Sequence, residues 1–227
     1  MRRHKIDWLR LAVHAGSIAP LVVLITNYTT ERLSVNPIQD VERITGHTAL
    51  MLLVVSLACT PANTVFGFKR ALSVRRALGL YAFYYAALHF LTFAVLDFGL
   101  DTALIQDEII QKRYQLIGLL ALIIMLPMAV TSTKTWQKRL GRRWRLLHRL
   151  VYLAALLAVV HFVWLVKSDI GEPLRFGAVV VILLTLRVPA VRRAVSQLRV
   201  RAVGAMRNVR ARRVSRKPPS GEAVQEV

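Results

Sequence analysis

Six apolar runs, each of about 20 residues, constrain the fold of this 227-residue chain more than any other feature. A helix of that length crosses a hydrocarbon core about 30 Å thick and satisfies its own backbone hydrogen bonds in lipid. The pattern therefore predicts an all-α membrane protein, a bundle of six transmembrane helices. The expected spans lie roughly at residues 8–26, 45–65, 77–97, 114–132, 146–166 and 174–190.

The charge distribution predicts the orientation of these spans. Most of the 32 Lys and Arg residues lie near the two termini and in the second and fourth connections. Six lie in the other connections, namely Arg32, Arg43, Lys112, Arg113, Lys167 and Arg175. The positive-inside rule then places both termini in the cytoplasm. This topology accounts for the net charge of +20 without a nucleic-acid partner.

The chain divides into a membrane domain and a basic tail. We expect residues 1–192 to form the transmembrane domain, because their connections are short and the first apolar run has no cleavage site after it. Residues 193–227 are basic and contain Pro, Ser and Gly, which predicts a cytoplasmic tail that is partly disordered or lies on the lipid surface. The single cysteine, Cys59, excludes a four-cysteine zinc or iron–sulfur site held by this chain alone.

Two histidines stand out because ionisable side chains are costly inside a membrane. His89 lies about 12 Å from the expected outer end of the third span, and His161 lies about 9 Å from that of the fifth. Two imidazoles at similar depth on different helices can bind one metal from opposite sides. A haem iron needs such an axial pair.

Small residues accompany both histidines. Their spacing places them on one helix face with each histidine: Gly79, Ala82 and Ala86 with His89, and Ala154 and Ala158 with His161. Such a face leaves room for a flat macrocycle, although small residues also allow helices to pack closely.

The other histidines give a less definite pattern. His148 precedes His161 by 13 residues and lies on a different face, so it is available to a second haem or to another carrier. Its counterpart before His89 is Arg76, which could pair with a haem propionate or mark the lipid interface. His14 and His47 could each bind a quinone by hydrogen bonding or serve as packing residues.

At this point the sequence resembles a known family. The stretches that carry the resemblance are "DWLRLAVHAGSIAPLVVL", "RRALGLYAFYYAALHF" and "AVTSTKTWQKRLGRRWRLLHRLVYLAALLAVVHFVW". They are similar to the MsrQ (YedZ) family, the haem-binding membrane subunits of MsrPQ methionine sulfoxide reductase systems, within the ferric-reductase-like transmembrane group. The resemblance covers about residues 6–192.

The resemblance implies an electron carrier. Electrons would come from the quinone pool or a cytoplasmic flavin reductase, pass through b-type haem, and reach MsrP, a periplasmic molybdopterin enzyme that repairs oxidised proteins. The sulfoxide chemistry would then belong to the partner, and no catalytic residue is assigned to this chain. The family histidines correspond to His89, His148 and His161. The family is also described as binding FMN, to which no residue is assigned here.

Three alternatives remain open from the sequence. Histidines inside a membrane could relay protons in a transporter. A self-contained ferric or cupric reductase would need no periplasmic partner. A structural membrane anchor would bind no haem.

Overall fold

The computed structural model of this chain describes residues 7–166 and 170–201, and these are almost entirely helical. The helices are α1 (Trp8–Thr29), α2 (Pro37–Phe66), α3 (Ala71–Leu91), α4 (Thr102–Gln111), α5 (Arg113–Val130), α6 (Lys134–Leu140), α7 (Arg142–Leu147), α8 (Val151–Leu165) and α9 (Gly171–Thr185). A π-helical segment, Thr92–Asp97, extends α3, and a 3₁₀ turn, His148–Leu150, joins α7 to α8. The all-α prediction is thus confirmed for the described residues.

Five spans are long and apolar enough to cross a membrane. They are Trp8–Thr29, Pro37–Phe66, Ala71–Asp97, Arg113–Val130 and Arg142–Leu165. The expected sixth span corresponds to α9, which is followed after an 80° bend by a helix at Pro189–Arg201. Counting that bent pair as one span gives the six that the sequence predicts.

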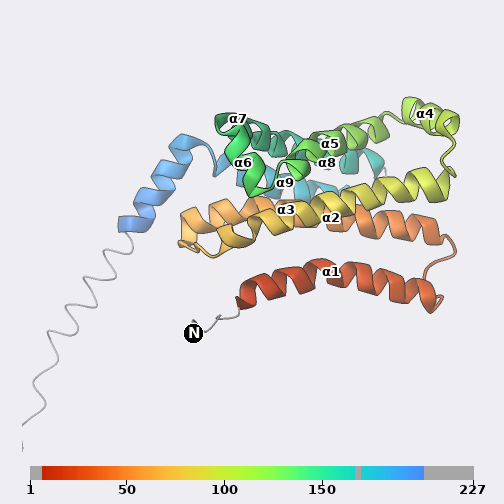
Figure 1. Cartoon of the computed structure of the whole chain (residues 1–227), viewed down its shortest axis with the longest axis horizontal. Helices are drawn as coiled ribbons and strands as arrows, with labels where there is room; N and C mark the ends of the chain where they lie inside the picture. Colours follow the sequence, from red (N-terminus) through yellow and green to blue (C-terminus); the bar gives the residue numbers. More distant parts are fainter. Residues whose placement is uncertain (1–6, 167–169, 202–227) are drawn as a thin grey trace, which may run out of the picture.

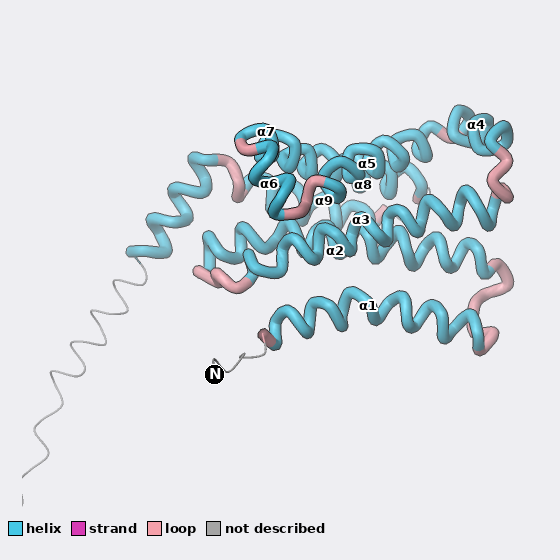
Figure 2. The backbone as a smooth tube through the Cα atoms, viewed as in Figure 1, coloured by secondary structure: helices cyan, strands magenta, loops and turns pink. Residues whose placement is uncertain are grey.

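The long helices lie roughly side by side, with α2 and α3 in the middle of the bundle (Figures 1 and 2). The start of α1, the α2–α3 connection, α6, α7 and the Pro189–Arg201 helix lie at one end, which we call the basic end. The α1–α2 connection and α4 lie at the opposite end (Figure 1). The basic connections therefore share one end, while the side of the membrane that it faces stays a prediction.

Local signals explain several helix boundaries. The side chain of Asn36 accepts a hydrogen bond from the backbone N–H of Gln39 and caps α2, whose first residue is Pro37. Gly67 ends α2 at a positive φ of 72°, a conformation that glycine adopts without strain. Asp101 caps α4, so part of an expected loop is helical.

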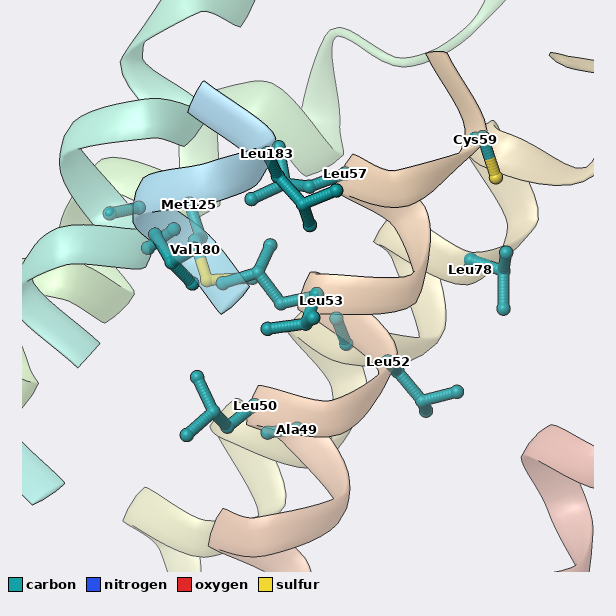
Figure 3. Packing of buried hydrophobic residues seen from close by; sticks show 14 of the residues in the cluster. Ala49, Leu50, Leu52, Leu53, Leu57, Cys59, Leu78, Met125, Val180 and Leu183 are labelled. Carbon is teal, nitrogen blue, oxygen red and sulfur yellow. The ribbon is translucent and has the colours of Figure 1, made fainter. Parts of the chain in front are cut away.

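The core gathers around α2, whose buried side chains point to more than one side of the helix (Figure 3). Leu53 and Leu57 are almost fully buried and lie near Met125 of α5 and Val180 and Leu183 of α9. On the outside of the bundle, large apolar side chains such as Val22, Leu120 and Ile182 are exposed, as expected for a surface that faces lipid.

Helix α1 lies at the edge of the bundle and is connected to α3 through a tyrosine hydroxyl. Tyr85 donates to the carbonyl of Ser17 at 2.8 Å and accepts from the N–H of Leu21 at 3.1 Å. Those two backbone groups would normally bond each other within the helix. The hydroxyl therefore sits between them next to Pro20, a residue that itself disturbs helical hydrogen bonding.

The C-terminal helix at Pro189–Arg201 contacts the end of α2. Arg199 donates to the carbonyls of Asn63 and Thr64 at 3.3 and 3.5 Å, in the last turn of α2, where the carbonyl of Asn63 also accepts from the N–H of Gly67. The expected tail at 193–227 begins inside this helix, and residues 202–227 lie outside the described residues.

Candidate functional site

His89 of α3 and His161 of α8 meet within the bundle. Their ring centroids lie 6.4 Å apart, with an angle of 73° between the ring planes. The residues come from two different spans and are separated by 72 positions, so only the packing of the helices brings them together.

Each ring is fixed by a backbone carbonyl of a neighbouring helix. Nδ1 of His89 donates to the carbonyl of Glu42 in α2 at 2.9 Å, and Nδ1 of His161 donates to the carbonyl of Tyr114 in α5 at 2.7 Å. A carbonyl can only accept, so the proton is assigned to Nδ1 in both rings. In a neutral imidazole, Nε2 then keeps its lone pair and can bind a metal.

Two glycines make room for the rings. A Cβ on Gly46 in α2 would lie 3.2 Å from Nδ1 of His89. A Cβ on Gly118 in α5 would lie only 2.8 Å from Nδ1 of His161, a distance that would force the ring to move. Each glycine also follows the accepting carbonyl by one helical turn, so one helix supplies both the space and the hydrogen bond.

The arrangement therefore occurs twice, at a constant offset of 72 residues. Both accepting carbonyls precede their histidine by 47 positions. The sequence alone shows no clear internal repeat, yet helices α2 and α3 share seven identical residues with α5 and α8 at this offset. The matched pairs are Gly46/Gly118, Ala49/Ala121, Leu50/Leu122, Ala82/Ala154, Ala86/Ala158, His89/His161 and Phe90/Phe162. Sliding the sequence past itself with His89 placed on His161 would have revealed these pairs.

The spacing of the rings fits one metal ion with two axial imidazoles. With a metal–nitrogen bond of about 2.0–2.1 Å and about 1 Å from nitrogen to ring centre, the two centroids would be about 6–6.5 Å apart. Among residues 7–166 and 170–201, no group of three or more His, Cys, Asp or Glu side chains could hold a metal. A metal at this pair would therefore take its other ligands from a cofactor, as a haem iron does.

The small residues near the pair lie in two places, in the core between the hairpins and against α2. Ala82 and Ala154 are fully buried in the core between the hairpins. Gly79 faces α2 instead, since a Cβ there would lie 3.4 Å from Oγ of Ser56. Gly79 thus allows close helix packing, which was the alternative explanation for the small-residue face.

His148 is not brought together with a second histidine. Its Nε2 lies 3.2 Å from Oγ1 of Thr131, and its ring stacks on Trp144 at 4.0 Å between centroids. Trp144 in turn donates from Nε1 to the carbonyl of Thr131 at 2.9 Å. These contacts join the end of α5 to α7 at the basic end, so His148 has local partners there.

The remaining membrane histidines also have side-chain partners. His14 of α1 shares a hydrogen bond of 3.0 Å with the hydroxyl of Tyr81 in α3. His47 of α2 lies 2.9 Å from Glu172 in α9 and packs edge-on against Phe176. Both contacts connect helices, as the packing interpretation expects, and the quinone interpretation is not tested by them.

Comparison with known proteins shows the family to which the chain is similar. The ferric reductase like transmembrane component family matches residues 44–159, a range that contains His89, His148 and both glycines. A protein of Rhodospirillum rubrum named protein-methionine-sulfoxide reductase heme-binding subunit MsrQ is 42% identical over 81% of this chain and 89% of its own length. The protein of the same name from Xanthomonas axonopodis pv. citri is 40% identical over 78% and 84%.

None of the solved structures matches the chain significantly. The sequence relatives, in contrast, cover most of its length at high identity and agree with the matched domain. The chain therefore belongs to the ferric reductase like transmembrane component family and, within it, to the family of subunits named MsrQ.

Proposed function

We propose that this chain is a membrane electron-transfer subunit of a methionine sulfoxide reductase system, with a b-type haem bound between His89 and His161. The observation that carries the proposal is the ring pair, whose 6.4 Å separation and Nδ1 hydrogen bonds suit two axial ligands of one iron. The names of the relatives, which describe a heme-binding subunit of this kind of reductase, support it.

The protein residues orient the two rings. The carbonyls of Glu42 and Tyr114 hold the proton of each ring on Nδ1 and increase the basicity of Nε2. Gly46 and Gly118 let the rings lie against the neighbouring helices, which fixes their rotation. A haem bound there would supply one-electron carriage, which no side chain of this pair can supply by itself.

The proposal extends to the partners. With the basic end in the cytoplasm of a bacterial inner membrane, electrons come from the quinone pool or a cytoplasmic flavin reductase. The acceptor is an MsrP-like periplasmic molybdopterin reductase that docks at the opposite end, beside the acidic residues of α4, Asp107 and Glu108. FMN is a second cofactor on the grounds of family alone, and His148 is the residue offered to a second haem.

The family match favours one second candidate, a ferric or cupric reductase that works without a protein partner. Both functions use the same haem. They differ in whether the reduced protein passes electrons to a metal chelate or only to a purified MsrP-like reductase, and stopped-flow reoxidation with each acceptor separates them.

The haem proposal is tested by the difference spectrum of the purified protein, reduced with dithionite against oxidised. We expect a b-type signal that is lost in His89→Ala and in His161→Ala. His47→Gln is the matched control, because it changes another histidine inside the bundle that bonds a side chain on a different helix.

The result that would overturn the proposal is a folded wild-type protein without haem after expression with ample haem supply. Retention of the full signal in either alanine variant would remove that histidine from the ligand pair. Loss of the signal in the His47 control would show that the spectrum reports general damage, and the assignment of the pair would then fail.

A further inference from the structure

A cavity opens at the basic end between α1, α3 and α6. Its volume is about 460 Å³, within the range of about 300–1,000 Å³ typical of small-molecule sites. Three helices that are distant in sequence contribute to its wall, with Arg10 from α1, Arg76 from α3 and Lys134 from α6. The cavity is separate from the pair His89 and His161, which are not among its lining residues.

The charged part of the lining is entirely basic. Arg10 forms an ion pair with Asp7 at 3.2 Å, and Asp7 is not part of the wall. Within residues 7–166 and 170–201, neither Arg76 nor Lys134 has an ion-pair partner. Arg76 and Lys134 are thus unpaired in the described part of the chain, and the ion-pair partner of Arg10 lies outside the cavity. These positive charges favour the binding of an anion in the space between them.

Part of the lining is apolar and lies further along the helices than the cations. Val13 follows Arg10 by three residues, and Leu80 follows Arg76 by four, so each lies about one turn closer to the middle of the bundle. Val74 and Ala77, on either side of Arg76 in the sequence, add apolar wall beside the cation. A ligand that fills the cavity would therefore have an anionic group at the basic end and an apolar or aromatic body that points inward.

The position of Arg76 is where the two hairpins differ. His148, its counterpart at the 72-residue offset, is engaged by Thr131 and Trp144. Arg76 instead lines the cavity, together with Ser73, whose hydroxyl donates to the carbonyl of Arg70, and His14, whose ring is bonded to Tyr81. One hairpin therefore closes its basic end with its own side chains, and the other leaves a cationic opening.

From this geometry we propose that the cavity binds a phosphate group attached to an apolar or aromatic body. Arg76 and Lys134 contact the phosphate, and Val13 and Leu80 cover the body. Two sources carry this chemistry, namely an anionic phospholipid and a flavin mononucleotide. The flavin source rests on the proposed function, which names FMN as a second cofactor without assigning it a residue, whereas the site itself does not rest on the haem assignment.

The test compares two double variants that remove equal charge. Arg76→Gln with Lys134→Gln changes the cavity, and Lys138→Gln with Arg142→Gln changes exposed cations of α6 and α7 that are not in its lining. Leu80→Trp fills the space without changing charge. Delipidated protein in neutral detergent is titrated with FMN and followed by quenching of flavin fluorescence, and native mass spectrometry measures retention of added phosphatidylglycerol.

We expect the cavity variant and Leu80→Trp to weaken binding of at least one probe by about tenfold or more, with the control unchanged. Loss for FMN alone identifies a nucleotide site, loss for the lipid alone identifies a headgroup site, and competition between them identifies a shared phosphate site. Equal binding of both probes by the cavity variant and the control would overturn the proposal. Because the haem spectrum is read separately, failure here is distinguishable from failure of the haem assignment.

Discussion

The two ends of the α3–α8 pair differ in symmetry. Toward the end opposite the basic end, His89 and His161 face each other. Each is held in the same way, by a carbonyl and a glycine of its neighbouring helix. Thirteen residues earlier, at the basic end, the same offset matches Arg76 with His148. One of these side chains lines a cavity and the other packs against Trp144.

The difference shows that histidines in the same membrane helices have different surroundings. At the end opposite the basic end, a second helix fixes each ring through its backbone, which leaves Nε2 available. At the basic end, Nε2 of His148 already has Thr131 as a partner. The neighbourhood of each histidine, rather than its depth alone, therefore separates the two ends.

The strongest way to disturb the contacts that hold His89 and His161, without changing a histidine, is Gly118→Ala. The new methyl group would lie 2.8 Å from Nδ1 of His161, so the ring must turn and lose its bond to Tyr114. We expect haem affinity to fall by about 10- to 100-fold, as for other residues that orient metal ligands. Titration of the apoprotein with haemin measures this, and unchanged affinity would show that the glycine has no positioning role.

Gly46→Ala tests the other half of the same arrangement. Its methyl group would lie 3.2 Å from His89, a contact that a shift of a few tenths of an ångström can relieve. We expect a loss in the same direction but smaller than that of Gly118→Ala, in the same titration. The reverse order would mean that the two halves are not held as their contacts indicate.

At the basic end, Thr131→Val should affect stability rather than haem. It removes the hydroxyl near Nε2 of His148 but keeps the carbonyl that accepts from Trp144. The same hydroxyl also donates to the carbonyl of Pro127, so two hydrogen bonds are lost. We expect stability to fall by about 1–2 kcal/mol and the haem spectrum to stay unchanged. Thermal unfolding in detergent beside the spectrum checks both, and a spectral change would place His148 in a haem site.

The smallest effect is expected from Arg76→His. This change would give position 76 the same residue as its counterpart in the other hairpin, His148. Both positions lie 13 residues before the ligand pair, which turns them away from its face by about 140°. The ratio of haem to protein should therefore stay the same, as measured by the pyridine haemochrome assay. A gain of one haem would show that residue identity alone separates the two ends.

Much of this arrangement could be predicted from the sequence because it depends on residue type. Apolar length gave the spans, and counting along them put His89 and His161 at similar depth. The accepting carbonyls of Glu42 and Tyr114 could not be predicted, since every residue has a carbonyl. Glycines are common in membrane helices for packing reasons, so Gly46 and Gly118 stand out only through their match at the 72-residue offset. The helical connections α6 and α7 were also missed, because their basic composition resembles that of a loop.

The carbonyl contacts also have a consequence for the order of assembly. His89 is fixed by α2 and His161 by α5, so each half of the site is complete within one hairpin of adjacent helices. Proteins rich in contacts between residues close in sequence fold faster than those that depend on distant pairs. We therefore expect each hairpin to orient its own ring before the two hairpins dock and bring His89 and His161 together.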